Sequence, residues 1–185
     1  MALIARGGEL ARDGNIDAAV SKFHKAQTWN PSLKFDPQAK AQEFVNKEQA
    51  ERLVTQGNYL VKEGKVTEAI AAYANAQQLD PKVEINANSW NSLCWDGSLH
   101  RHAADVMFAC EKAVQLAPNE GYIRDSRGLA RALTGNTQGA IEDFEAFIAW
   151  TDDKEQKSQR QRWVKDLHAL KNPFTDAELK TLLQQ

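Results

Sequence analysis

The sequence predicts an all-α fold made of stacked helical hairpins, and three observations support this prediction. Residues 4–31 align with residues 54–81 without a gap, so that Gly7 falls on Gly57, Gly14 on Gly64, Ala19 on Ala69 and Pro31 on Pro81. Within each copy the apolar residues recur at helical spacing. Glycine and proline occur where such helices have to turn or stop. A hairpin of this kind cannot bury its apolar face alone, so neighbouring copies must stack.

The second copy shows how each hairpin is encoded. Its first helix carries Leu60 on an apolar face and ends at Gly64, because glycine adopts the left-handed conformation of a helix C-cap at the least cost. Its second helix ends before Pro81, since proline disfavours helical geometry in the preceding residue. The small residues Ala69 and Ala76 let two helix backbones approach closely. We therefore expect both alanines at a helix–helix contact.

Two further copies follow, one from Trp90 to Pro118 and one from Arg124 onward with Gly135 and Phe144 in register. An insertion after Pro31 lengthens the first helix of the second copy. Asp36-Pro37 is a favourable helix start, and the helix is predicted to run to Lys62 over about 25 residues, or roughly 40 Å. The predicted hairpins span about residues 2–33, 37–83, 87–119 and 121–151, within a repeat region of residues 1–152.

Residues 153–185 are predicted to form a capping helix and a short terminal helix. Asp152-Asp153 suits a helix N-terminus, because negative charge complements the helix dipole there. An apolar stripe that would close the last repeat follows, made of Trp163, Val164, Leu167 and Leu170. Thr175 and Glu178 have the spacing of a capping box, which opens the terminal helix.

These residues resemble the tetratricopeptide repeat, a helical hairpin of about 34 residues with small and large residues alternating across the seam and a terminal proline. The resemblance covers residues 2–151 and implies a right-handed α-solenoid. The third copy departs from the pattern at Gly97 and residues 99–102, and the fourth at three arginines. The chain also resembles, more weakly, repeat arrays appended to larger bacterial signalling or protease-like proteins. Because the first repeat starts almost at Met1, we expect an excised part of a longer chain.

The resemblance implies a binding face lined by the first helices of successive repeats. Carried over residue by residue, this concave face comprises Asn58, Lys62, Asn88, Asn91, Trp95, Ser98, Tyr122, Asp125 and Leu129. Asparagine amides can bind an extended peptide backbone, and aromatic rings supply rigid anchoring area. The alternative is a merely solvated surface with Trp95 half-buried. The family's carboxylate clamp is incomplete, since Val54 and Ser92 replace its expected lysine and asparagine.

Charge and composition exclude some classes of binding partner. The net charge is −2 and the isoelectric point is about 6.1, whereas a nucleic-acid binder needs a basic excess. No apolar stretch is long enough to cross a membrane. Cys94 and Cys110 lie in apolar helical segments, so we expect buried, reduced thiols and a cytoplasmic protein.

No catalytic, metal or cofactor motif is recognisable. The sequence lacks a phosphate-binding glycine loop and a nucleophile motif. His100, His102 and the two cysteines match no zinc spacing, and a surface turn explains the histidines better. We therefore expect no enzyme, no metal and no cofactor.

Arg124, Arg127 and Arg131 form one stripe at helical spacing. The stripe could bind an acidic peptide, since guanidinium groups pair with carboxylates. The interpretation we favour is an internal seam of ion pairs with Asp96, Glu111 or Asp143, because the repeat pattern places these positions between helices.

The predicted function is protein–protein interaction, with a peptide or a partner domain bound by a module of a larger protein. As this fragment the chain is expected to be a monomer that binds neither nucleic acid nor membrane. One alternative is an intramolecular scaffold or oligomerisation element without a separate ligand. RNA binding by a helical array is a second and weaker alternative.

Overall fold

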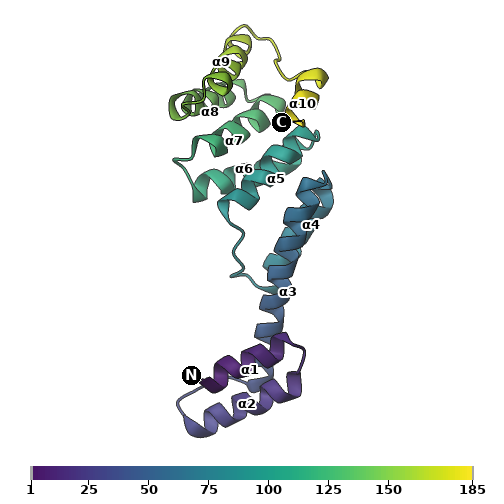
Figure 1. Ribbon diagram of the computed structural model, residues 1–185, viewed down its shortest axis with the longest axis vertical. Coiled ribbons are helices and arrows are strands. Elements are labelled where there is room, and N and C mark those ends of the chain that lie inside the picture. The colour runs from purple at the N-terminus through teal and green to yellow at the C-terminus, as the bar shows by residue number, and fades with distance from the viewer. Residues whose placement is uncertain (1, 185) are drawn as a thin grey trace. The chain divides into compact units, whose positions relative to one another are not determined.

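The structure, a computed structural model, describes residues 2–184, and these residues form helices and connecting turns without a strand (Figure 1). The helices are α1 (Ala2–Arg12), α2 (Ile16–Trp29), α3 (Pro37–Lys62), α4 (Val66–Leu79), α5 (Ala87–Leu99), α6 (Ala103–Leu116), α7 (Gly121–Leu133), α8 (Thr137–Trp150), α9 (Lys154–His168) and α10 (Asp176–Leu182). The predicted all-α solenoid of helical hairpins is confirmed. Met1 and Gln185, the end residues of the two predicted ranges, lie outside the described residues.

Contacts divide the chain into two compact units. Unit 1 comprises Met1–Gln56 and Ala72–Glu84, and unit 2 comprises Gly57–Ala71 and Ile85–Gln185. The boundary therefore passes through the second hairpin. The division predicted at residue 152, between repeats and cap, stays a prediction.

Unit 1 is held together by aromatic packing between the first hairpin and α3. Phe23 of α2 stacks on Phe44 of α3 with ring centroids 5.9 Å apart. Gly7 lies so close to the Phe23 ring that a Cβ atom at this position would come within 2.5 Å of it. The close approach of α1 and α2 at this point therefore leaves room only for glycine. α3 begins where expected, since the Asp36 carboxylate accepts a hydrogen bond from the Ala39 amide at 2.7 Å.

The hairpin turns share one backbone conformation. Gly14, Gly64 and Gly135 have φ angles of 81°, 70° and 87°, in the left-handed region that glycine adopts at little cost. In the third hairpin the equivalent residue is Arg101, with φ of 69°. The third repeat departs from the repeat pattern at residues 99–102, and in the structure this departure places an arginine where the other turns have glycine.

The core of unit 2 joins the fourth hairpin to the C-terminal helices. Phe144 of α8 packs against Trp163 of α9 and Phe174 after it, with centroid distances of 5.4 and 6.0 Å. Asp153 and Thr175 cap α9 and α10 through backbone amides, as predicted. The Glu178 side chain does not complete the capping box but accepts a hydrogen bond from the Trp163 indole at 3.0 Å.

One member of the predicted apolar stripe is misplaced. Trp163 and Leu167 are buried, whereas Leu170 is 91% exposed. α9 ends at His168, and Leu170 adopts a φ of 58°, so it no longer follows the face of the helix. The prediction that Leu170 belongs to the stripe is wrong, because helical spacing does not extend beyond the helix end.

Ala69 tests the hairpin register. Its side chain is fully buried, while that of Ala71 on the same helix is exposed. We expect Ala69→Leu to lower the free energy of unfolding by about 1–3 kcal/mol, because extra atoms in a packed interior force neighbouring groups apart. Ala71→Leu is the matched control and should change it little. Urea denaturation of both variants measures the difference, and equal effects would mean that the register is wrong.

Candidate functional site

Six of the nine residues predicted to bind a partner lie at the surface of unit 2. They are Asn58, Lys62, Asn88, Asn91, Trp95 and Tyr122, and we call this set the first-helix face. α5 and α7 pack side by side and supply four of the six, and the end of α3 supplies the other two. The start of α5 is fixed by Asn86, whose side chain accepts a hydrogen bond from the Ser89 amide at 2.9 Å.

The other three predicted residues are buried and do not belong to this face. Ser98 is fully buried and donates a hydrogen bond to the Cys94 carbonyl at 2.6 Å. Leu129 is part of the core of unit 2. Asp125 is 4% exposed and pairs with Arg160. The repeat pattern placed these three residues on the correct helices. It did not show that α9 and the core of unit 2 cover their side chains.

Direct hydrogen bonding links the two repeats on the first-helix face. The Tyr122 hydroxyl donates to the Asn88 side-chain oxygen at 2.9 Å, and the two residues are 34 positions apart, one repeat length. Asn91, one turn further along α5, has a buried side-chain oxygen without a hydrogen-bond partner in the described chain. An unsatisfied buried acceptor costs free energy until a donor reaches it.

The charged groups beside this face come from α3 and α5. Burial raises the pKa of Asp96 above its ordinary value, while the charges of His100 and Lys62 oppose the rise. The His100 ring also lies within 2.9 Å of the Asp96 carbonyl oxygen. Lys62 is exposed. The first-helix face is therefore mainly amide and aromatic in character, with a basic group at one end.

Asp125 and Arg160 form a buried ion pair between α7 and α9. The guanidinium donates to both carboxylate oxygens, with the Nη2 atom 2.6 Å from Oδ2. It also lies over the rings of Phe147 and Trp163, at 5.1 and 4.5 Å from their centroids. Burial raises the pKa of Asp125, and the hydrogen bonds and charge of Arg160 oppose that rise.

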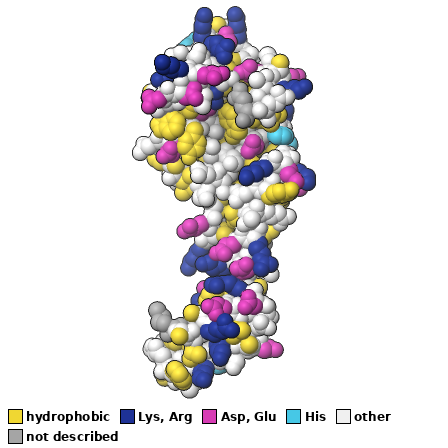
Figure 2. Space-filling view, in the orientation of Figure 1, with side chains coloured by type: hydrophobic (Ala, Val, Ile, Leu, Met, Phe, Trp, Pro, Cys, Tyr) yellow, Lys and Arg dark blue, Asp and Glu magenta, His cyan; other side chains and the backbone are white. Residues whose placement is uncertain are grey.

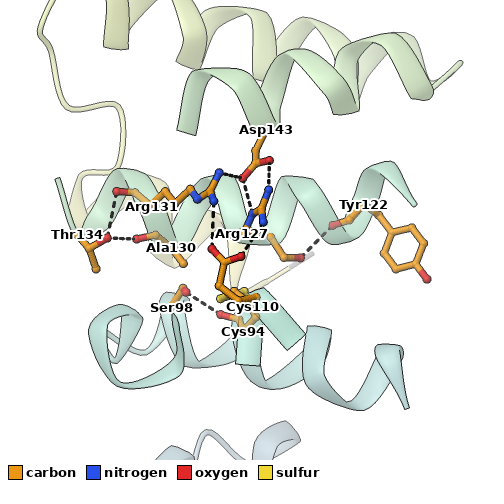
Figure 3. The surroundings of a disulfide bond; sticks show 11 residues. Cys94, Ser98, Cys110, Tyr122, Arg127, Ala130, Arg131, Thr134 and Asp143 are labelled. Carbon is orange, nitrogen blue, oxygen red and sulfur yellow. Dashed lines mark hydrogen bonds and ion pairs between the residues drawn. A yellow bond between two sulfur atoms is a disulfide. The ribbon is translucent and has the colours of Figure 1, made fainter. Parts of the chain in front are cut away.

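The three arginines of α7 form the internal seam that we favoured over a peptide grip. Arg124, Arg127 and Arg131 all pair with the fully buried Asp143 of α8, at 3.3, 2.8 and 2.9 Å. Glu111 of α6 pairs with Arg127 and Arg131 at 2.8 and 3.0 Å. In Figure 3, Arg127 and Arg131 point toward Asp143 above the disulfide. These ion pairs link α6, α7 and α8, and each of the three arginines already has a carboxylate partner within the protein.

Cys94 and Cys110 form a disulfide between α5 and α6 (Figure 3). The expectation of reduced thiols is therefore wrong, and the cytoplasmic location inferred from it loses its support. The pairing of the two cysteines was not predicted from the sequence. The signal was present, however, because both are equidistant from His102 at the turn, which places them opposite each other in an antiparallel hairpin.

Arg160 was also missed, although the sequence contains its signal. It precedes Trp163 and Leu167 at helical spacing and so lies on the stripe of α9 that becomes buried. A basic residue on such a stripe requires a buried partner. Asp125 provides that partner.

The described residues contain neither a metal-binding cluster nor a membrane-spanning helix. Among residues 2–184, no group of three or more histidine, cysteine or acidic side chains could hold a metal ion. The His102 ring instead contacts Asp105 at 2.9 Å. No helix in the described chain combines the length and apolar character that a membrane span needs.

The fold is that of a tetratricopeptide-repeat domain. Its helices pair in antiparallel hairpins, its turns have a left-handed residue, and residues in contact across neighbouring hairpins are 34 positions apart, as Asn88 and Tyr122 are. Among solved structures, the chain is similar to the tetratricopeptide-repeat domain of P58(IPK), with a TM-score of 0.56 and 17% sequence identity. The similarity covers 91% of this chain but 46% of that one, so the chain spans about half the length of that relative. No protein-family model and no curated protein sequence matches the chain.

Proposed function

We propose that this protein is a non-enzymatic protein-interaction module that binds an extended peptide segment through the first-helix face. The fold supports a role in protein interaction, since stacked hairpins offer a long surface on which a partner can lie. The observation that carries the peptide proposal is the buried, unpartnered side-chain oxygen of Asn91. Because this oxygen is buried, a peptide has to displace the groups that cover it before one of its backbone N–H groups can donate to the oxygen.

The neighbouring side chains fit the same ligand. Asn88 and Tyr122 fix each other by a hydrogen bond at 2.9 Å, so both are ordered before a partner arrives. Trp95 packs against the core of unit 2 and is half-buried, so part of its side chain remains exposed to a partner. Ordered amides and rigid rings reduce the conformational entropy that binding costs. Neither a metal nor a cofactor is part of the proposal.

The proposal is tested with peptides selected from a random display library against the full chain. We expect Asn91→Ala to weaken binding of a selected peptide by about fivefold to tenfold, the equivalent of one hydrogen bond. The fold should be unaffected, because the substitution removes an unsatisfied buried oxygen. Asn75→Ala, at an exposed asparagine of α4, is the matched control. Fluorescence polarisation measures the affinities, and unchanged binding by Asn91→Ala would contradict the proposal.

The alternative without a separate ligand makes a different prediction in solution. An oligomerisation element would give a mass above 20.7 kDa in light scattering, whereas we propose a monomer. An oligomer together with a failure to select any peptide would favour the scaffold role.

The disulfide bears on the compartment in which this module works. Disulfides persist in oxidising environments and are rare in the reducing cytoplasm. We therefore propose an oxidising compartment in place of the cytoplasm, on the basis of the bond between Cys94 and Cys110.

A further inference from the structure

An aromatic surface lies where the start of α7 meets the end of α8. Trp150, the last residue of α8, is 49% exposed. Its ring contacts that of Tyr122 at 5.9 Å between centroids, with an interplanar angle of 59°. Gly121 lies directly against the indole, because a Cβ atom there would come within 2.5 Å of it. Tyr122 belongs to the first-helix face, so the aromatic pair continues that surface.

Two other exposed aromatic rings, Trp29 and Phe108, each have a lysine of the chain itself nearby. The Lys25 ammonium lies 5.5 Å from the centroid of Trp29, and Lys112 lies 4.3 Å from Trp90 and 5.6 Å from Phe108. Cations bind aromatic faces through the negative potential of the ring. Within residues 2–184, Trp150 and Tyr122 have no such cation.

Two carboxylates are close neighbours of this aromatic pair in the sequence. Glu120 is the N-cap residue of α7, but its side chain makes no capping hydrogen bond. Asp152 follows Trp150 by two residues and is exposed. Neither is in an ion pair within the described part of the chain. Near the ends of α7 and α8, Figure 2 shows hydrophobic side chains next to acidic ones.

We propose that Trp150 and Tyr122, with Glu120 and Asp152, bind a basic side chain of the partner peptide, arginine above all. A guanidinium stacks on aromatic rings and pairs with carboxylates at its edge, so it uses both features of this surface at once. The Arg160 site of the same protein has this composition, with a guanidinium over two rings and paired with Asp125. This inference rests on the proposed function, because the peptide is the one that lies on the first-helix face.

The first test uses N-acetyl-arginine amide as the probe and the Trp150 indole resonance of the 15N-labelled chain as the readout. We expect the arginine amide to shift this resonance at millimolar concentration, and added salt to weaken the effect. N-acetyl-norleucine amide, which has a side chain of similar length without charge, is the matched probe and should not shift it. Equal shifts from both probes would overturn the inference.

The second test uses the display-selected peptides on the full chain. We expect selected peptides to contain arginine or lysine, and replacement of that residue by glutamine to weaken binding by about tenfold. Trp150→Leu should weaken it similarly. Since Trp150 also packs on Gly121, the double variant Glu120→Gln with Asp152→Asn provides a test that leaves this packing intact. Trp29→Leu, at an exposed ring that already carries Lys25, is the control.

The outcomes separate this inference from the proposed function. If Asn91→Ala weakens binding but the arginine replacement and the carboxylate variant do not, the basic-side-chain inference fails and the peptide-binding face stands. If no peptide binds the chain, both fail. Loss of affinity in all of these variants, with Trp29→Leu unchanged, is the result we expect.

Discussion

Arg160→Met is expected to lower the free energy of unfolding by about 3–5 kcal/mol, because it leaves the Asp125 carboxylate buried without a partner. Asp125 is 4% exposed, and Arg160 donates hydrogen bonds to both of its oxygens. The methionine retains much of the packing on Phe147 and Trp163, so the charge dominates the change. Urea denaturation followed by circular dichroism measures the difference.

The loss of stability should depend on pH. Burial raises the pKa of Asp125, and Arg160 opposes that rise, so the pKa in the variant lies higher still. A carboxyl whose pKa is higher in the folded state binds more protons when folded, so its charge destabilises the fold as pH rises through that pKa. We therefore expect a smaller deficit at about pH 5 than at about pH 8. A deficit independent of pH would contradict the role of Asp125.

Two further variants test whether the effect comes from the ion pair between Asp125 and Arg160. Arg162→Met changes an exposed arginine on the same helix and should leave the stability nearly unchanged. Adding Asp125→Asn to Arg160→Met removes the buried charge and should restore part of the stability at about pH 8 while abolishing the pH dependence. Without such a recovery, the effect of Arg160→Met would have to come from packing alone.

Removal of the disulfide is expected to cost about 3 kcal/mol of unfolding free energy, the value for a closed loop of about 15 residues. Cys94 and Cys110 are separated by 16 positions and fully buried. We expect the variant Cys94→Ala with Cys110→Ala to unfold at a lower urea concentration than the wild type. A reductant should lower the midpoint of the wild type and leave that of the variant unchanged.

The same bond tests the compartment. The thiol state in the source cells is fixed by acid, and the protein is then unfolded in denaturant and alkylated. Because both cysteines are buried in the fold, only alkylation of the unfolded chain shows, by mass, whether a disulfide protected them. Protected cysteines support an oxidising compartment. Alkylated cysteines, or a wild-type midpoint that a reductant leaves unchanged, would contradict the disulfide in the working protein.

Much of the fold could be predicted because each hairpin is encoded locally. Gly14, Gly64 and Gly135 are needed at left-handed positions, and Pro31 and Pro81 follow the second helices, so turns and ends are visible in the sequence. The long α3 was predictable for the same reason, since Asp36 caps it and no proline occurs within it after Pro37. Arg101 shows the limit of local signals, since the third turn has the same conformation without glycine.

The candidate site was only partly predictable because burial depends on contacts between distant segments. Asp125 has the spacing of a binding residue, yet Arg160, which is 35 positions away, covers it. Leu129 is covered in the same way by the core that the C-terminal helices complete. Helical periodicity shows which residues of one helix lie on the same face. It does not show which helix from a later part of the sequence packs on that face.

The most direct test of peptide binding is a map of the bound peptide on the 15N-labelled chain. Titration with a display-selected peptide should shift backbone amides of α5 and α7 around Asn88, Asn91 and Tyr122, together with the Trp150 indole. Amides on the exposed side of α6 should remain in place. Shifts confined to α6, α8 or the terminal helices α1 and α10, with α5 and α7 unaffected, would contradict binding at the first-helix face.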